Sequence, residues 1–440
     1  MGVVGPGGVY HDPLRLNRTA CLVAIVTEII TDDESHVCGA LCVDVSTEDV
    51  AVQVIRCKAM IICAAGVGKR LRGSDRSGWM FNLANPTSMT GDAIAAAYRA
   101  GAEIVGGRMR SIKEAPTLAA SRFMSCGGKN TWVGIHTNIY GEPISDQFPK
   151  PDWRVGPCDS YLDPEYETHY LKGEPIFLNM MDCTKEDMDY MLWALPHEGQ
   201  GATLDHLAAE GFDFKKHMIE WCDGISGAAH PGGIYAVNNK FETTVPGLYV
   251  ASGAANGMVA LSGAAVTGTI TGRYAAEYIK GREFKAAEKS DLVEKCAEHY
   301  SRLLSNPADD SSPTWYEANV AIQQVMLAYA GTGVVSEELF EVGLQHLSRL
   351  RKKFDHLQAG NAHDFMRCME VESLAACAEL GILECRSRKE TRGSTLYANY
   401  PDKDPSWNGM RPSIRLVNGK NVFGRRGKRT ECSEFDISKY

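Results

Sequence analysis

Short apolar runs alternate with polar turns between residues 20 and 66, which is the pattern of a β-rich segment. Three strands are predicted, at Ala20–Ile30, Cys38–Val45 and Val50–Cys57. A fourth run, from Ala59 to Ala65, is almost uniformly apolar and ends in Gly66. Such a run fits a strand buried in a parallel sheet, followed by a turn. Because glycine has no Cβ, backbone at this turn can approach a ligand closely.

Residues 90–101 have the composition of a small-residue helix that packs closely on a sheet. We expect Thr90 or Asp92 to cap its first turn and Gly101 to end it. Two interpretations are open. The helix serves packing alone, or it also presents its positive N-terminal end to an anionic ligand.

The composition and periodicity of the sequence change at several points after this helix. Residues 103–223 spread aromatic, proline and charged residues and predict a separate α+β module, with helices at 185–195 and 204–211. Residues 224–282 return to small residues. Residues 284–385 have helical periodicity, clearest at 338–350 and 365–380, and the polar tail contains a hairpin turn at Asn418-Gly419.

Composition narrows the class of protein. The 440 residues are 44% hydrophobic, which is enough for a core and excludes a disordered or fibrous chain. A net charge of −9 argues against a nucleic-acid or membrane-surface binder. No apolar run reaches the roughly 18 residues of a transmembrane helix, and no signal peptide opens the chain. We therefore expect a cytoplasmic protein without membrane insertion.

The 14 cysteines form no C-x-x-C pair, so a zinc ribbon or an internal iron–sulfur cluster is not expected. They are interpreted as reduced, mostly buried thiols. Cys126, beside two glycines, has no partner cysteine or evident activating base that would make it a redox thiol. The histidines are scattered, and no metal site is predicted.

Three segments in order resemble the succinate dehydrogenase/fumarate reductase flavoprotein family, which includes L-aspartate oxidase and the adenylylsulfate reductase flavoprotein. Lys58-Ala-Met-Ile-Ile-Cys-Ala-Ala-Gly66, followed by Thr90-Gly-Asp, is similar to the family's KAVILATGG and TGDG elements. His230-Pro-Gly-Gly-Ile, followed by Pro246-Gly-Leu-Tyr-Val-Ala-Ser-Gly253, is similar to H…GGI…PGLYAAGE. Ser387-Arg-Lys-Glu-Thr-Arg-Gly393, followed by Tyr400-Pro401, is similar to SR-ESRG…YP. The resemblance covers about residues 20–410.

The resemblance implies an α/β fold: a two-layered, Rossmann-like FAD-binding domain with an inserted α+β capping domain and a C-terminal helical domain. The FAD-binding domain would comprise 1–102 and 224–283, the capping or substrate domain 103–223, and the helical domain with its tail 284–440. By the family pattern Asp92 would contact FAD, and Gly66 and Gly253 would line its groove. The cofactor contacts at the isoalloxazine ring would come from Leu261, Ser262, Gly263, Ala264 and Ala265.

The start of the chain departs from this pattern. The glycine-rich segment from Gly2 to Gly8 follows no strand and is interrupted by Pro6, so it does not read as the family's GxGxxG phosphate loop. We expect the first part of the FAD-binding domain to be incomplete and the chain alone to bind FAD poorly. A fragment, the second half of a split gene and a misplaced start codon are the alternatives, and another chain could supply the segment.

The substrate site departs as well. His230 matches a family histidine, but the expected His-Pro-Thr reads Ala115-Pro116-Thr117, and no arginine lies between Lys240 and Arg273. Since arginine is the natural fork for a carboxylate, fumarate and succinate are not expected to be turned over. Arg122 and Arg392, with His230, are the catalytic candidates.

The resulting hypothesis is an FAD-dependent oxidoreductase that transfers hydride between flavin N5 and a small molecule other than a simple C4 dicarboxylate. An adenylylsulfate-reductase-like activity and an electron-transfer partner subunit are compatible with the resemblance. The alternative is a truncated or non-catalytic relative that does not hold FAD and acts as a folded subunit.

Overall fold

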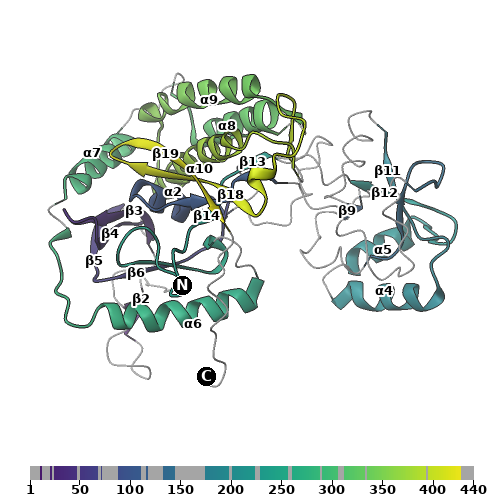
Figure 1. Ribbon diagram of the computed structural model, residues 1–440, viewed down its shortest axis with the longest axis horizontal. Coiled ribbons are helices and arrows are strands. Elements are labelled where there is room, and N and C mark those ends of the chain that lie inside the picture. Colours follow the sequence, from purple (N-terminus) through teal and green to yellow (C-terminus); the bar gives the residue numbers. More distant parts are fainter. Residues whose placement is uncertain are drawn as a thin grey trace.

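The computed structural model describes residues 10–11, 20–21, 24–46, 50–67, 71, 88–110, 115–116, 132–143, 174–197, 201–222, 228–255, 260–287, 290–305, 312–331, 334–392 and 395–427. These residues form a main body of sheets and helices and a smaller lobe at one side (Figure 1). The small strands β1 (Tyr10–His11) and β2 (Ala20–Cys21) pair with each other.

The first large sheet is antiparallel and has the order β3-β4-β5, with β3 at Ile25–Thr31, β4 at Val37–Asp44 and β5 at Ala51–Arg56. Seven of the eight β4 residues are buried, as a central strand requires, whereas β5 is largely exposed. The three predicted strands are confirmed, although the first is shorter than expected and separate from β2.

A parallel pair of strands follows. β6 (Met60–Cys63) lies beside β15 (Leu248–Ala251), and the long helix α6 (Ala260–Tyr278) packs against both. Because β6 and β15 are far apart in sequence, the pair joins the two segments that resemble the family's strand motifs. The predicted parallel strand before Gly66 is confirmed, although it ends at Cys63 and is less buried than expected.

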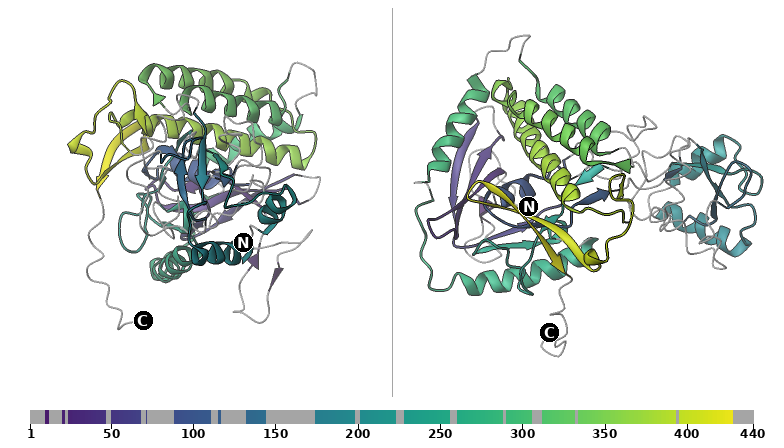
Figure 2. Two further views of the ribbon diagram at one scale, coloured as in Figure 1. Left: turned by 90° about the vertical axis from the view of Figure 1, so that its right-hand side faces the viewer. Right: turned by 45° about the horizontal axis from the view of Figure 1, so that its top comes forward.

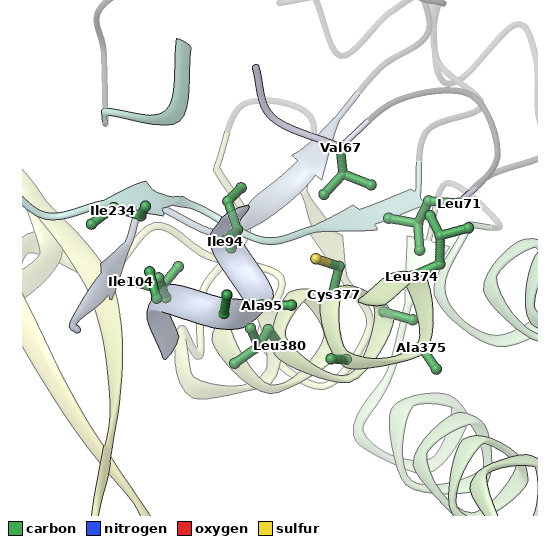
Figure 3. Packing of buried hydrophobic residues seen from close by; sticks show 14 of the residues in the cluster. Val67, Leu71, Ile94, Ala95, Ile104, Ile234, Leu374, Ala375, Cys377 and Leu380 are labelled. Carbon is green, nitrogen blue, oxygen red and sulfur yellow. The ribbon is translucent and has the colours of Figure 1, made fainter. Parts of the chain in front are cut away.

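Helix α2 (Asp92–Arg99) lies between strand β3 and helix α10 (Ala362–Ser387). Its alanines and Ile94 are buried against Leu374, Cys377 and Leu380 of α10, and Figure 3 shows this close packing. Small side chains allow the two helices to approach, and volume changes in such a core are costly. Gly101, at φ +92°, ends α2 as predicted.

The side lobe has its own sheet, in the order β10-β11-β12-β9. The strands are β9 (Ala115–Pro116), β10 (Ile135–Thr137), β11 (Ile176–Asn179) and β12 (Ile219–Cys222), and the helices are α4 (Lys185–His197) and α5 (Gly201–Ala209). A separate cluster of buried side chains, including Trp132, Leu178, Met191 and Leu207, forms its core. Figure 2 shows the same separation from a second direction.

Two strand pairs connect the lobe to the main body. The outgoing strands β7 (Ile104–Val105) and β8 (Arg108–Arg110) pair with the returning strands β14 (Gly233–Ile234) and β13 (Ala228–His230), respectively. Residues 104–110 therefore pair within the main body, although sequence composition placed them in the insertion.

The helical region contains α7 (Asp291–Ser305), α8 (Trp315–Ala330), α9 (Glu337–Arg351) and α10, with the 3-10 helix η6 (Phe354–His356). Thr314 and Glu317 form a capping box on α8. Strands β16 (Val334–Val335) and β17 (Leu396–Tyr397) pair in parallel beside these helices. The helices predicted near 338–350 and 365–380 are confirmed.

The tail returns to the main body. After η7 (Pro405–Trp407), strands β18 (Met410–Val417) and β19 (Lys420–Gly427) form a hairpin around Asn418 and Gly419, both at positive φ. The predicted hairpin turn is confirmed. β18 pairs with β7, so this part of the tail extends a sheet of the main body rather than the helical region. No helix within the described ranges is long and apolar enough to cross a bilayer.

Candidate functional site at the ends of β6 and β15

The two parallel strands end at the same edge. Met60 pairs with Leu248 and Cys63 with Ala251, so the loops that follow leave side by side. The Ala254 N–H donates to the Ala64 carbonyl at 2.7 Å and joins the two loops. Ligands of open α/β sheets bind outside the carboxyl ends of parallel strands. This edge is therefore the candidate binding site.

The structure brings Gly66 and Gly253 together at this edge. A Cβ built on Gly253 would lie 3.5 Å from Ala65 Cα and 3.6 Å from the Ala64 carbonyl oxygen. Gly253 and Ala65 are exposed, and Gly66 is partly exposed. Ser252 takes φ +63°, an uncommon conformation for a residue with a Cβ that is often found at functional turns. The surface is therefore open backbone with small side chains.

His230 reaches the same loop from the returning strand β13. Its Nε2 lies 2.9 Å from the Val67 carbonyl oxygen and its Nδ1 lies 2.6 Å from that of Pro231. A Cβ built on Gly66 would lie 4.0 Å from His230 Cε1. A neutral imidazole donates to one of these two carbonyls and an imidazolium to both. The side chain is 7% exposed, so it lies beneath the loop rather than projecting from it.

The first turns of α6 carry the predicted residues Leu261, Ser262, Gly263, Ala264 and Ala265. Thr267 ties this end of the helix to the β15 loop, because its Oγ1 accepts from Ser252 N–H at 2.9 Å and donates to the Gly263 carbonyl at 2.6 Å. Leu261 is 86% exposed, although it is apolar. The face of α6 that carries Gly263 and Thr267 thus packs on the Gly253 loop.

Asp92 begins α2, and Thr90, two residues before it, forms a β-bridge with Val67, the residue after Gly66. The Asp92 carboxylate accepts from Thr90 Oγ1 and lines a cavity of about 250 Å³ between β3, α2, α7 and α10. Burial raises its pKa, and hydrogen bonds from Thr90 and Ser373 oppose the rise. The expectation that Thr90 or Asp92 caps α2 is wrong: Gly91, at φ +83°, occupies the N-cap position without a side-chain cap bond.

Arg392 is held within the segment after α10. Its guanidinium donates to both carboxylate oxygens of Glu390, at 2.8 and 2.9 Å, and to Asn408 Oδ1 at 2.9 Å. These contacts do not connect it to His230. Several predicted residues lie outside the described ranges: Arg122, Cys126, Thr117 and the glycines from Gly2 to Gly8.

Two buried carboxylates were missed from the sequence. Glu384 accepts from the Gly107 and Gly232 N–H groups, and Glu390 accepts from Arg388 and Arg392. Glu384 stands in a helix between apolar residues and cysteine, and this interruption of an apolar stretch was its only signal. Glu390 is part of the SR-ESRG-like motif, in which only Arg392 was predicted to have a role.

One group of possible metal ligands occurs at the turn between β3 and β4. Asp32, Glu34 and His36 place one possible ligand atom each within 4.8 Å of one another. Asp32 Oδ1 already accepts from the Glu34 and His36 N–H groups, as in an ordinary polar turn.

The edge fits a flat cofactor. Gly66 and Gly253 present backbone without side chains, and the first turns of α6 pack against the Gly253 loop. A side chain at Gly253 would project from this open surface. The residues present therefore fit one part of a dinucleotide or flavin site.

The comparisons with known proteins agree with this geometry. Residues 16–128 match the family model of an FAD binding domain, and residues 320–412 match that of the fumarate reductase flavoprotein C-terminus. A relative from Methanocaldococcus jannaschii, called an uncharacterized FAD-dependent oxidoreductase, is 22% identical over 91% of this chain and 70% of its own.

Two solved structures share the fold. Adenylylsulfate reductase from Archaeoglobus fulgidus superposes with a TM-score of 0.73 at 18% identity, covering 93% of this chain and 73% of that one. A variant of E. coli quinol fumarate reductase gives 0.69 at 18% identity, covering 92% and 71%. The expected fold and the resemblance drawn from the three motifs are confirmed.

Proposed function

We propose that this chain acts as an FAD-dependent oxidoreductase of the fumarate reductase/succinate dehydrogenase flavoprotein family. The observation that carries the proposal is the meeting of Gly66 and Gly253 at the carboxyl ends of a parallel strand pair, against which α6 packs. These segments lie about 190 residues apart in the sequence, yet the fold assembles them into one open edge.

The chain's own residues have distinct parts in this proposal. FAD, when bound, supplies hydride transfer at flavin N5. The Gly66 and Gly253 loops bind by close backbone approach, and the α6 N-terminus stabilises negative charge on an electron-rich ring. Thr267 holds the Gly253 loop to α6, and His230 supports the Gly66 loop through Val67.

The side lobe is proposed to be the capping domain, within the predicted boundaries 103–223 between the two FAD-binding parts, 1–102 and 224–283. Its separate sheet and separate core support movement as a unit. Closure of such a lobe would exclude water from a reacting ring. Residues 284–440 form the helical domain and tail of this division. An electron-transfer partner subunit would deliver or remove the electrons.

The substrate is proposed to be a small molecule other than a simple C4 dicarboxylate. No arginine stands between Lys240 and Arg273 to form the fork that a carboxylate needs. An adenylylsulfate-like anion is compatible with this absence of a fixed fork. His230, Arg122 and Arg392 stay the candidates for the substrate side of the reaction.

FAD binding is the first test. The chain is titrated with FAD while flavin fluorescence and the visible absorption band are followed. We expect saturable binding that Gly253→Val weakens about tenfold or more, equal to roughly 1.4 kcal/mol, because the new side chain covers the open edge. Gly272→Ala is the matched control, since a Cβ there has no heavy atom within 4 Å.

The rival function, a folded subunit that does not hold FAD, makes the opposite prediction. In that case no saturable fluorescence change occurs at any FAD concentration, and Gly253→Val matches the unaltered chain. That result would overturn the proposed function, whereas weak but saturable binding sensitive to Gly253 supports it.

Fumarate reduction tests the substrate class. The FAD-loaded protein is assayed with a reduced viologen dye and fumarate. We expect no detectable turnover, because losing one charged anchor of a carboxylate typically costs about 2–5 kcal/mol. Two of the family's anchors are absent here: the histidine before Pro116 and the arginine expected between Lys240 and Arg273. Turnover of about one per second or faster, within the ordinary enzyme range, would show that the substrate class is wrong.

A further inference from the structure

One buried carboxylate contacts both strands that connect the side lobe to the main body. Glu384 lies on α10 and is fully buried. Its Oε1 accepts from Gly107 N–H at 3.0 Å, between the outgoing strands β7 and β8. Its Oε2 accepts from Gly232 N–H at 2.8 Å, between the returning strands β13 and β14. Each oxygen thus holds one of the two crossings, by which we mean the turn at Gly107, where the chain leaves the main body, and the turn at Gly232, where it returns.

The crossings leave no free space around this carboxylate. A Cβ on Gly107 would overlap Glu384, and a Cβ on Gly232 would overlap the Val105 carbonyl. On α10, a Cβ on Gly381 would lie 2.8 Å from the Ala229 carbonyl oxygen. Glycine at these positions lets α10 and both strands approach closely enough for a single side chain to join them.

The strand pair leads directly to the candidate site. β13 pairs with β8 through Ala228–Arg110, Ala229–Met109 and His230–Arg108. His230 is two residues before Gly232, and its ring contacts Val67, the residue after Gly66. A shift at Gly232 would therefore move His230 relative to the Gly66 loop.

We propose that Glu384 is a positioning residue that anchors both crossings at once and through them holds His230 against Val67. The anchor consists of the chain's own side chain and backbone, so it forms whether or not FAD binds. In the ionised carboxylate both oxygens act as acceptors, and each of them faces an N–H donor. A side chain with one acceptor and one donor can hold only one crossing.

The test is hydrogen exchange of backbone amides in the full chain, measured by NMR on Glu384→Gln. The glutamine keeps the shape but replaces one acceptor by an NH₂ donor. We expect the amide of Gly107 or Gly232 to exchange at least about tenfold faster, equal to roughly 1.4 kcal/mol. The ring signals of His230 should shift with it, while exchange in α2 and α9 stays unchanged.

Glu379→Gln is the matched control, because Glu379 lies on the same helix and pairs with Arg351 away from the crossings. It should leave the Gly107 and Gly232 amides and the His230 ring unaffected. Glu384→Ala should accelerate both glycine amides. Unchanged exchange at both glycines in the glutamine and alanine variants would overturn the proposal, and so would an equal loss of protection over the whole chain.

The unaltered chain gives a test that does not depend on a variant's folding. Gly107 and Gly232 lie in two-residue connections, where amides without partners exchange rapidly. If Glu384 anchors them, both exchange as slowly as amides in the core of α10. Rapid exchange of either glycine in the unaltered chain would refute the anchor.

Discussion

Two fully buried glutamates, Glu384 and Glu390, lie six residues apart at the end of α10 but hold different kinds of partner. For Glu384, burial raises the pKa to about 7, although the N–H groups of Gly232 and Gly107 oppose the rise. For Glu390, burial alone would raise the pKa, but hydrogen bonds from Arg392 and Arg388 hold it below its usual range.

The difference shows that burial does not by itself decide the behaviour of a carboxylate. Arg388 and Arg392 surround Glu390 with charge of opposite sign, so it stays ionised and locks the turn after α10 to the Asp404 segment. Glu384 has no cationic partner among these contacts: it meets backbone N–H groups, and the negative charge of Glu103 adds to the rise of its pKa. The first group is a fixed structural ion, and the second responds to its surroundings near neutral pH.

Removing the Glu390 charge should give the largest loss of stability. Glu390→Gln leaves two half-buried arginines facing each other without their common, fully buried anion. Breaking a buried ion pair from one side costs about 3 kcal/mol or more. The measurement is the free energy of unfolding in urea. Glu338→Gln, which changes an exposed carboxylate on α9, is the control, and a loss below about 1 kcal/mol would contradict the fixed-ion interpretation.

Adding a side chain at the Gly232 crossing should lower the free energy of unfolding by somewhat less. Gly232→Ala places a methyl group against the Val105 carbonyl, and overpacking of this kind typically costs about 1–3 kcal/mol. Gly272→Ala, in an open position on α6, should be neutral or slightly stabilising, because alanine favours helix. Equal unfolding midpoints for the two variants would show that the crossing can adjust without cost.

The sequence predicted the elements well because their signals are local. The apolar run into Gly66, the small-residue helix ending at Gly101 and the Asn418-Gly419 hairpin each depend on neighbouring residues. Gly66, Gly253 and His230 could be chosen because three motifs occurred in a known order.

What the sequence could not provide was the long-range pairing. Glu384 acquires its importance only because Gly107 and Gly232, 277 and 152 residues away, meet it. The return of β18 to β7 is equally nonlocal. Gly91 replaced the expected polar cap because it sits against Cys377 and Val67, where a Cβ has no space. Tertiary packing overrode local preference there.

The pH dependence of stability should distinguish the two glutamates directly. A carboxyl group whose folded pKa is raised makes the native chain bind more protons, so stability rises as pH falls from about 8 toward 5. Between pH 8 and 5.5 we expect a gain of about 2 kcal/mol from Glu384. The measurement compares urea unfolding of the unaltered chain and Glu384→Gln at both pH values.

The difference between the two proteins isolates this group. His299, whose pKa is raised by its hydrogen bond to Glu372, contributes a change of the same sign in both and therefore cancels. The same pH-dependent gain in Glu384→Gln as in the unaltered chain would mean that Glu384 does not titrate near neutrality.

The smallest expected effect concerns Arg392. Arg392→Lys keeps the charge but loses the planar fork that contacts Glu390 and Asn408 together. Because Arg388 still pairs with Glu390 at 2.6 Å, the loss of stability should be only about 1 kcal/mol. Coupling is measured by a double-mutant cycle with Glu390→Gln, and the two losses of stability should combine to less than their sum, since both remove the same contact.

The same variants also separate the two roles offered for Arg392. A structural partner of Glu390 changes unfolding and leaves the FAD titration unaffected. A side chain that also reaches substrate would depress turnover by far more than this small loss of stability could explain, and it would do so in Arg392→Lys even where the protein remains fully folded.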